Sequence, residues 1–363
     1  MISEFYRIVS TPLQYHGQKI DWKSVERVLV VRLRSIGDTV LVTPSLIALR
    51  RFLPVAEIDI LLENWVAPVL DGHDCVNRVI SIPNEPAVRL KIARQLRQRK
   101  YDLVFNLHGG TTSTFFTRAT GARYRIGYSH YQYSFLYNRL YSSASDFWQT
   151  ETTHSAEQHL ALLGFAGVPV ADKPKSRLVV TDESSRSLSE KFKHGNPSGL
   201  ESVGQFAMLH PAAAFATKQW ETANYARTAE YLAEKGIKSI AVAAGHEREI
   251  LKKLVSESEV PIMTFDDLTL PEITALASRA TLFVGNDSGV AHMAAAVGTP
   301  SVVVFGSSNR NHWRPWTDAP NEIVFEALPC QPCPGYVCAE FGEPKCILSV
   351  RPESVFAAID KLL

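Results

Sequence analysis

The sequence predicts an α/β protein with two doubly wound, Rossmann-like domains. Its 363 residues correspond to about two domains of ordinary size. Short β-branched apolar segments alternate with helical segments in both halves, an order typical of parallel sheets covered by helices on both faces. Hydrophobic residues make up 45% of the chain, enough for each domain to bury an ordinary core. Because the halves are alike, we expect two domains facing across a cleft, with ligands beyond the carboxyl ends of the strands.

Charge and composition exclude several classes of protein. Lys and Arg (38) nearly balance Asp and Glu (37), so the formal charge of +1 provides no overall attraction to nucleic acid. No apolar run approaches the roughly 20 residues that span a bilayer, and the first residues lack the apolar core of a signal peptide. Five cysteines are too few for a disulfide scaffold. We therefore expect a soluble, cytoplasmic protein.

The first half contains the clearest strand in the chain. Residues 27–33 (RVLVVRL) form a β-branched apolar stretch typical of a buried parallel strand. Further strands are expected at 58–62, 79–82 and 103–107, with helices at 39–52, 66–70 and 87–99. Pro44 lies inside the first of these helices, which therefore either begins there with Thr43 as its N-cap or is kinked.

The second half repeats this rhythm after a polar segment. Residues 171–204 are rich in Ser, Lys, Gly and Pro, and we expect the domain junction there. Strands are expected at 207–210, 239–243, 281–285 and 301–305, with helices at 225–235, 247–256, 271–278, 290–297 and 351–363. The chain thus divides into an extension packed on the surface (1–26), a first domain (27–180), a second domain (181–345) and a C-terminal segment (346–363).

The segment TLFVGNDSGVAHMAAAVGTPSVVVF carries the most informative pattern. Its loop at 285–289 (GNDSG) ends at the start of the expected helix, where free N–H groups and the helix dipole favour an anion. Gly289 lets a ligand approach the backbone, and His292 lies one turn further in. Alternatively, Asp287 and Ser288 only cap the helix, and His292 is a satisfied core residue.

Three shorter patterns point to the same chemistry. Asp38 follows a strand, a loop and a glycine, so it lies near a helix start and suits a general base, although Asp is also a common cap. Thr217 and Lys218 follow a loop of small residues and suit a pyrophosphate, although surface lysines are common. Glu247 follows a strand end and suits the hydroxyls of a ribose, unless it only stabilises its own helix.

Together these patterns resemble a known family. GDTVLVTPSLIALR, the triplet at 218–220 (KQW) and GNDSGVAHMAAAVGTP, in this order, resemble the ADP-heptose:lipopolysaccharide heptosyltransferases of glycosyltransferase family 9 over roughly 27–360. The resemblance implies a GT-B fold, in which two Rossmann-like domains hold the acceptor and the nucleotide-sugar. It also implies that the C-terminal helix packs back on the first domain.

The resemblance implies a role for each matching residue. Asp38 becomes the catalytic base, and Lys218, with Thr217 beside it, contacts the donor diphosphate. The remaining donor contacts are Asp287, Ser288, Gly289, His292 and, at the ribose, Glu247. For the acceptor we expect Arg34, Gly37, His108 and Arg118.

These roles predict an inverting heptosyl transfer from ADP-heptose to a lipopolysaccharide core. Asp38 would take the proton of the acceptor hydroxyl from one domain, while Lys218 and the N–H groups near Ser288 neutralise the departing ADP from the other. No D-x-D motif is present, and the pair Asp266-Asp267 has the wrong spacing. We therefore expect neither a catalytic metal nor a cofactor.

Three alternatives come from other interpretations of the same patterns. The fold suits a transferase of another nucleotide-sugar, or a binding module without turnover, although a binder needs no base such as Asp38. An NAD-dependent oxidoreductase would need a GxGxxG fingerprint, which the chain lacks.

Residues 89–125 form a local basic run. They hold one acidic residue, Asp102, and nine basic ones, namely Arg89, Lys91, Arg94, Arg97, Arg99, Lys100, Arg118, Arg123 and Arg125. This surplus indicates attraction to an anionic acceptor, with peripheral contact at the inner face of the membrane, or else a solvated helix face.

Four of the cysteines cluster near the C-terminus. Cys330, Cys333, Cys338 and Cys346 have the spacing C-x2-C-x4-C-x7-C. In a cytosolic protein such clustering indicates a structural zinc more than disulfides, but the spacing matches no zinc pattern closely. Free or partly oxidised thiols therefore remain the alternative.

Overall fold

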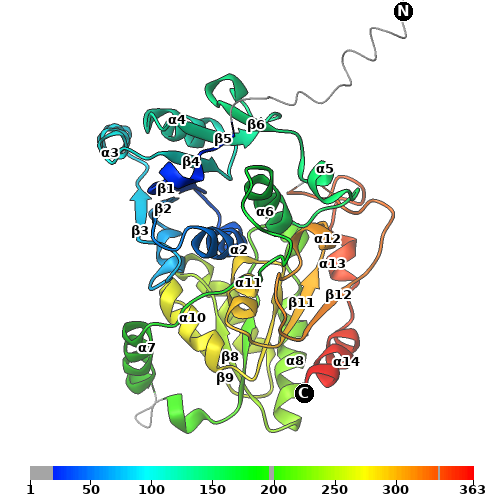
Figure 1. The fold of residues 1–363 in the computed structure, drawn as a ribbon. Coiled ribbons are helices and arrows are strands. Elements are labelled where there is room, and N and C mark those ends of the chain that lie inside the picture. The colour runs from blue at the N-terminus through cyan, green and yellow to red at the C-terminus, as the bar shows by residue number, and fades with distance from the viewer. Residues whose placement is uncertain (1–18, 196–199, 334–335) are drawn as a thin grey trace, which may run out of the picture. The chain divides into compact units, whose positions relative to one another are not determined.

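The structure, a computed structural model, describes residues 19–195, 200–333 and 336–363. The described residues divide into two compact units. Unit 1 comprises the described residues up to Arg34 together with Pro44–Ala67 and Asp74–Pro174. Unit 2 comprises Ser35–Thr43, Pro68–His73 and Lys175–Leu363. Figure 1 labels the helices and strands of both units.

In its described part, unit 1 holds one six-stranded parallel sheet in the order β3-β2-β1-β4-β5-β6. Its strands are β1 (Arg27–Val31), β2 (Glu57–Glu63), β3 (Arg78–Ile82), β4 (Leu103–Asn106), β5 (Tyr124–Tyr128) and β6 (Arg139–Tyr141). In the central register, Val28 pairs with Ile58 on one side and Leu103 on the other. This is the strand order of a Rossmann fold, in which the connections reverse direction between the first and fourth strands.

Helices cover this sheet because their apolar residues recur at helical spacing. The helical elements of unit 1 are η1 (Trp22–Ser24), α3 (Pro86–Gln98), α4 (Thr111–Ala119), η3 (Ser134–Leu136), α5 (Ala144–Trp148) and α6 (Ser155–Phe165). Ile92 and Leu96 of α3 are buried in one core cluster with Leu29 and Leu61 of the sheet. The sequence did not predict α4, β5 or β6, because β5 (YRIGY) and β6 (RLY) carry no β-branched run.

Helix α2 (Ile36–Phe52) begins earlier than predicted and continues through Pro44. A proline at this position has no N–H to donate to the carbonyl of Val40. The hydroxyl of Thr43 donates to that carbonyl instead, at 2.7 Å. Pro44 therefore neither starts nor ends the helix, and the predicted cap at Thr43 is wrong. Helix η2 (Ala67–Leu70) follows β2 in the chain.

In its described part, unit 2 also holds one six-stranded parallel sheet, in the order β12-β11-β10-β7-β8-β9. Its strands are β7 (Phe206–His210), β8 (Lys238–Val242), β9 (Ile262–Phe265), β10 (Leu282–Asn286), β11 (Ser301–Phe305) and β12 (Asn321–Phe325). Numbered from β7, this is the same Rossmann order as in unit 1. The prediction of two parallel α/β sheets is confirmed.

The helices of unit 2 include one, α7 (Asp182–Gly195), that the sequence did not predict. They are α7 (Asp182–Gly195), η4 (Leu200–Val203), η5 (Ala216–Lys218), α8 (Thr222–Glu234), η6 (Gly245–Glu247), α9 (Arg248–Glu257), α10 (Leu270–Arg279), α11 (Gly289–Ala296), α12 (Arg310–Trp313), α13 (Lys345–Leu348) and α14 (Pro352–Leu362). Helix α7 lies within the polar segment at 171–204 that was expected to be a junction. Phe192 and Leu188 are buried, so a narrow apolar stripe anchors an otherwise polar helix. The last stretch of unit 1 ends at Pro174, which lies within the expected junction at 171–204.

The C-terminal helix packs on the sheet and on a helix of its own unit. Helix α14 belongs to unit 2, where it packs against α8, β11 and β12 (Figure 1). Val355, Ala358 and Ile359 join the core cluster of unit 2, which also contains Trp220. The apolar face of α14 is therefore buried within unit 2, and the expected packing on the first domain stays a prediction.

Most of the expected N-terminal extension, residues 1–18, lies outside the described residues. Its last part packs on unit 1, because Trp22 lies edge-on against Phe52 with ring centroids 5.0 Å apart and donates to the carbonyl of Ala166. Among residues 19–195, 200–333 and 336–363, no helix is both long and apolar enough to cross a membrane.

Candidate functional site

The candidate site lies at the switch point of the unit 2 sheet. Strands β7 and β10 are neighbours there, and their connections leave in opposite directions, which opens the edge where doubly wound folds bind ligands. Strand β7 ends at His210 and β10 ends at Asn286. The loop after each strand carries residues that the sequence singled out.

Asn286 fixes the loop that follows β7. Its side-chain amide donates to the carbonyl of Pro211 at 3.0 Å, and its side-chain oxygen accepts from the backbone N–H of Trp220 at 3.0 Å. Asn286 and Trp220 are both fully buried. The two ends of the loop that contains η5 are therefore tied to the end of β10, which limits where Lys218 can lie.

Lys218 and Asp287 form an ion pair inside this frame. Nζ of Lys218 lies 2.7 Å from Oδ2 of Asp287, and the hydroxyl of Ser308 donates to the same oxygen at 2.6 Å. The Asp287 side chain is only 5% exposed, whereas that of Lys218 is 25% exposed. Asp287 therefore holds the ammonium group in place, and Lys218 keeps a solvent-facing part with which to meet an anion.

Ser288 caps helix α11 and contacts a buried histidine. Its hydroxyl accepts from the N–H of Ala291 at 3.4 Å and lies 3.2 Å from Nδ1 of His210. Burial lowers the pKa of His210 to about 4, so this imidazole is neutral at neutral pH. The start of α11 combines free N–H groups with a positive dipole end, and all residues of the helix after Gly289 are buried.

The first turn of α2 packs against the first turn of α11. A Cβ placed on Gly37 would lie 2.8 Å from Cδ2 of His292, and one on Gly289 would lie 2.7 Å from Cβ of Ile36. Both separations are too short for real side chains, so glycine is required on both sides. The two most specific sequence motifs are therefore in direct contact within unit 2.

Asp38 lies in the first turn of α2, which groups with unit 2 and not with unit 1. Segment Ser35–Thr43 groups with unit 2, whereas the sequence predicted Asp38 in the first domain (27–180). The reason is the close approach of the glycines at the two helix starts. Oδ2 of Asp38 accepts from the hydroxyl of Ser35 at 3.0 Å and from its N–H at 3.3 Å, so the carboxylate also caps its own helix.

His292 lies among the charged groups of the site. It is buried, and burial, the largest cause, lowers its pKa. The carboxylates of Asp287 and Asp38 act in the opposite direction, whereas Lys218 lowers the pKa further. Nδ1 of His292 has no hydrogen-bond partner among the described residues. The buried imidazole thus lies close enough to the expected base and to the expected phosphate-binding residues for their charges to act on its pKa.

The backbone of Thr217 packs against the residues that directly follow β11, the neighbour of β10 in the sheet. Its carbonyl accepts from the N–H of Ser307 at 3.2 Å, and a Cβ on Gly306 would lie 2.2 Å from that carbonyl oxygen. The Thr217 hydroxyl is buried and has no hydrogen-bond partner within the described part of the chain. Such an unpaired buried hydroxyl costs free energy unless a ligand or water satisfies it.

Glu247 is engaged locally. It ends η6 just beyond β8, and its carboxylate accepts from the N–H of Ala244 at 3.0 Å. This is the helix-stabilising alternative raised from the sequence. Glu247 still lies at the carboxyl edge of the sheet, because β8 is the neighbour of β7. A contact with a ribose remains a prediction.

The expected acceptor residues fall in two places. Gly37 lies in unit 2, whereas Arg34, His108 and Arg118 lie in unit 1. Arg34 follows β1 and His108 follows β4, so they share the carboxyl edge of neighbouring strands. Arg118 is exposed on α4 and lies near enough to Arg125 to help lower its pKa, after the larger effect of burial. Their role in binding an acceptor remains a prediction.

The basic run in unit 1 is partly engaged in structural contacts and partly exposed. Part of it is structural: Arg99 contacts Glu57 at 2.8 Å and the buried Asp59 at 2.9 Å, and Arg125 donates to backbone carbonyls. The remainder includes four exposed side chains, Lys91, Arg94, Arg97 and Lys100. Of these, Lys91, Arg94 and Arg97 lie on α3 together with Leu90, which is 55% exposed.

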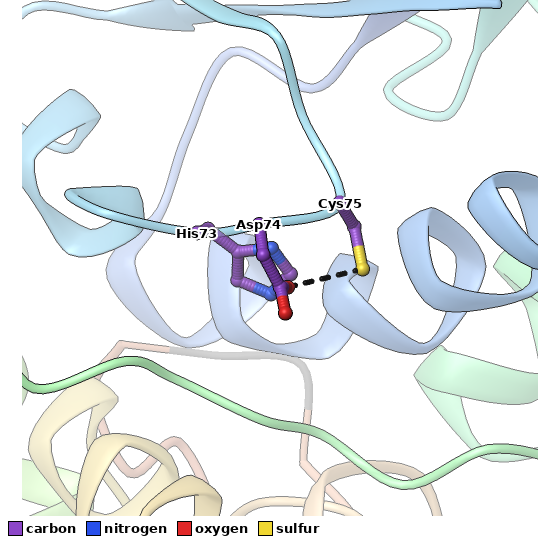
Figure 2. A group of neighbouring side chains, drawn as sticks. All are labelled: His73, Asp74 and Cys75. Carbon is purple, nitrogen blue, oxygen red and sulfur yellow. Dashed lines mark hydrogen bonds between the residues drawn. The ribbon is translucent and has the colours of Figure 1, made fainter. Parts of the chain in front are cut away.

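One group of described residues brings three possible metal ligands within 4.8 Å of one another, the consecutive residues His73, Asp74 and Cys75. Figure 2 shows the Cys75 thiol directed at the Asp74 carboxylate, to which it donates at 3.4 Å. Nε2 of His73 lies 3.2 Å from the carbonyl of Arg177. Because these polar atoms already have partners, we assign no metal to this loop.

Comparison with known proteins decides the family. The model of glycosyltransferase family 9 (heptosyltransferase) matches residues 89–342. The chain is also 30% identical to lipopolysaccharide heptosyltransferase 3 of Escherichia coli over 355 residues, covering 91% of this chain and 97% of that protein. The chain belongs to glycosyltransferase family 9. The protein is therefore a glycosyltransferase, as the sequence motifs indicated.

Solved structures of the family share the fold. A family 9 glycosyl transferase from Veillonella parvula superposes with a TM-score of 0.80 at 20% identity, covering 95% of this chain and 98% of that one. The E. coli heptosyltransferase WaaC with ADP-2-deoxy-2-fluoro heptose gives a TM-score of 0.68 at 20% identity, covering 93% and 100%. The predicted GT-B class, two Rossmann-like α/β units, is confirmed.

The sequence did not indicate three residues of the candidate site. His210, Asn286 and Ser308 contact Ser288, the loop after β7 and Asp287, respectively. His210 and Asn286 are the last residues of parallel strands, a position that could have indicated them. Ser308 follows β11 by three residues and carries no comparable signal.

Proposed function

We propose that this family 9 enzyme transfers a heptose from ADP-heptose to a lipopolysaccharide core acceptor, with inversion and without a catalytic metal. The observation that carries the proposal is the 2.7 Å Lys218–Asp287 pair beside the first turn of α11. This arrangement suits a leaving diphosphate, because it offers an oriented cation and free N–H groups at one point.

The donor is proposed to bind along the carboxyl edge of the unit 2 sheet. Lys218 and the N–H groups near Ser288 and Gly289 would hold the diphosphate, and the unpaired hydroxyl of Thr217 would donate to it. Asp287 positions Lys218, because a carboxylate in direct contact with a diphosphate would repel it. Glu247 would accept from the ribose hydroxyls.

Support for a heptose carried on ADP comes from two relatives. The E. coli protein that is 30% identical to this chain is named lipopolysaccharide heptosyltransferase 3. The WaaC structure, which shares the fold, holds an ADP-heptose analogue. A transferase of another nucleotide-sugar is the alternative that the donor experiment below distinguishes.

The transfer is proposed as a single displacement. Asp38 accepts the proton of an acceptor hydroxyl while the oxygen of that hydroxyl bonds to the anomeric carbon. The bond from the anomeric carbon to the diphosphate oxygen breaks in the same step, and its electron pair leaves with ADP. Lys218 and the start of α11 neutralise the charge that develops on that oxygen. Attack opposite the leaving group inverts the anomeric configuration.

The acceptor is proposed to be anionic and to approach unit 1. Arg34, His108 and Arg118 offer polar groups there, and the exposed basic residues of α3 would attract phosphate-bearing lipid cores at the inner face of the cytoplasmic membrane. Leu90, exposed among these charges, would add apolar contact with lipid.

The decisive experiment incubates the protein with ADP-heptose and truncated lipopolysaccharide cores and measures the mass of the product. We expect the mass of one heptose to be added without added divalent cations, and NMR of the product to show the inverted anomer. A melting-temperature panel of ADP, ADP-sugars, UDP-sugars and NAD tests the donor, because a bound ligand stabilises the folded state. Stabilisation by UDP-sugars alone would show that the donor is a UDP-sugar and not ADP-heptose. Absence of transfer from every nucleotide-sugar would refute the proposal.

A further inference from the structure

The four clustered cysteines surround one cavity in unit 2. Cys330, Cys333, Cys338 and Cys346 all line a space of about 10 Å³, which is close to the volume that one water-sized sphere occupies. All four are free thiols. The rest of the lining is largely apolar, including Leu328, Val337 and Phe341, and Lys345 is the only charged residue among its described residues.

The chain between the first two cysteines is a tight turn fixed to the sheet. The N–H of Gln331 donates to the carbonyl of Leu328 at 3.1 Å, and its side chain donates to the carbonyl of Gly306 at 2.6 Å. The Cys333 thiol points back to the carbonyl of Cys330 at 3.0 Å. Both cysteines of this C-x2-C turn line the same cavity, on a loop that these hydrogen bonds hold in place.

Two backbone hydrogen bonds connect this turn to the candidate active site. The N–H of Cys333 donates to the carbonyl of Ser307 at 2.9 Å, and the N–H of Ser307 donates to the carbonyl of Thr217 at 3.2 Å. Thr217 itself lines the cysteine cavity, and Lys218 follows it in the chain. The position of Lys218 therefore depends on the order of the cysteine turn.

We propose that Cys330, Cys333, Cys338 and Cys346 bind one soft divalent transition metal, Zn²⁺ or Fe²⁺, as four thiolates. Tetrahedral thiolate sites of this kind are closed structural sites, with Zn–S bonds of about 2.3 Å. The metal would have no part in bond cleavage. Its role is to fix the turn at 330–333 and, through Ser307, the η5 turn that carries Lys218.

Binding requires the sulfurs to move inward. In the described part of the chain, the three-ligand group within 4.8 Å is His73, Asp74 and Cys75, so the four clustered sulfurs are not yet at ligand separations. Because all four cysteines line the same cavity, rotation about their Cα–Cβ bonds would have to bring the sulfurs together there. Each thiol releases a proton as it binds the metal, so binding releases protons and strengthens as pH rises.

The test measures metal content in protein purified under reducing conditions without a metal-affinity column. We expect about one zinc or iron per wild-type chain. Cys333→Ser together with Cys338→Ser should remove it, whereas Cys75→Ala should keep it, because Cys75 is a buried cysteine of unit 1 outside the cluster. Cobalt substitution should give the visible absorption of a tetrahedral thiolate complex.

A second measurement uses the wild-type chain, in case the double variant fails to fold. Removal of the metal with a strong chelator should expose four additional reactive thiols and weaken ADP binding by roughly tenfold. Metal-free wild-type protein, or equal metal content in the double variant, would overturn the proposal. Heptosyl transfer without added metal is a separate result and concerns only the proposed function.

Discussion

Lys218 donates from Nζ to Oδ2 of Asp287 across 2.7 Å, joining two residues that are 69 positions apart in the chain. Ser308 donates to the same carboxylate oxygen, so Asp287 is satisfied from inside the protein. The lysine faces outward from this anchor. The arrangement converts a flexible side chain into an oriented cation at the start of α11, where charge on a leaving diphosphate would develop.

Replacing Lys218 with Gln should weaken ADP binding by roughly 10- to 100-fold, the range for losing a hydrogen bond to a charged group. Adenosine binding should change little, because the proposed contact is to phosphate. Calorimetric titration with both ligands measures the difference. Lys252→Gln is the matched control, since Lys252 is exposed and pairs only locally with Glu249. Equal losses for ADP and adenosine would exclude a phosphate contact.

Replacing Asp38 with Asn should lower kcat at least about 100-fold, because the amide cannot take the proton of the acceptor hydroxyl. ADP affinity should stay within about twofold of wild type, a difference well under 1 kcal/mol. Single-turnover transfer and ADP titration measure the two effects. Ser35→Ala separates the roles of the carboxylate, because it removes a capping hydrogen bond to Asp38 and leaves the base. Normal turnover in the Asn variant would show that another group is the base.

Replacing Gly289 with Ala should destabilise unit 2 by about 1–3 kcal/mol, the usual cost of overpacking. The new Cβ would lie 2.7 Å from Cβ and Cγ2 of Ile36. Urea unfolding measures the loss, and the double variant with Ile36→Ala should recover part of it, since Cγ2 is removed. Additive effects of the two substitutions would argue against this contact.

The buried His210 should make folding stability depend on pH. Its pKa is lowered to about 4 by burial, so the unfolded chain binds a proton below about pH 6.5 that the folded chain does not. The stability it contributes is therefore complete above that pH and decreases as the pH falls toward 4. Between about pH 7 and pH 5 the loss should be on the order of 2 kcal/mol.

The variant His210→Asn tests this dependence, because an amide can still face the hydroxyl of Ser288 but does not titrate. Free energies of unfolding in urea are compared at several pH values. The wild-type curve should fall more steeply than that of the variant over this range. Parallel curves would contradict the assignment of the dependence to His210.

Local patterns in the sequence were sufficient for much of the fold and for several of the residues that the structure brings together at the candidate site. Strands such as 27–31 and 301–305 are largely buried. Burial of this kind requires a run of apolar residues, which can be recognised in the sequence alone. The motifs around Asp38, Lys218 and Asp287 could be recognised for the same reason, because each lies in the connection that follows a buried strand. Helix α7 was missed because its apolar stripe is too narrow to stand out in a polar segment.

Only the tertiary structure decided which residues act together. Three features depend on contacts between distant segments. Gly37 lies against His292, Ser308 donates to Asp287, and the first turn of α2 groups with unit 2. The course of α2 through Pro44 was also open until the hydroxyl of Thr43 was seen to satisfy the carbonyl of Val40. Periodicity records which side of an element is buried, whereas the partner on that side is set by close packing of the whole unit.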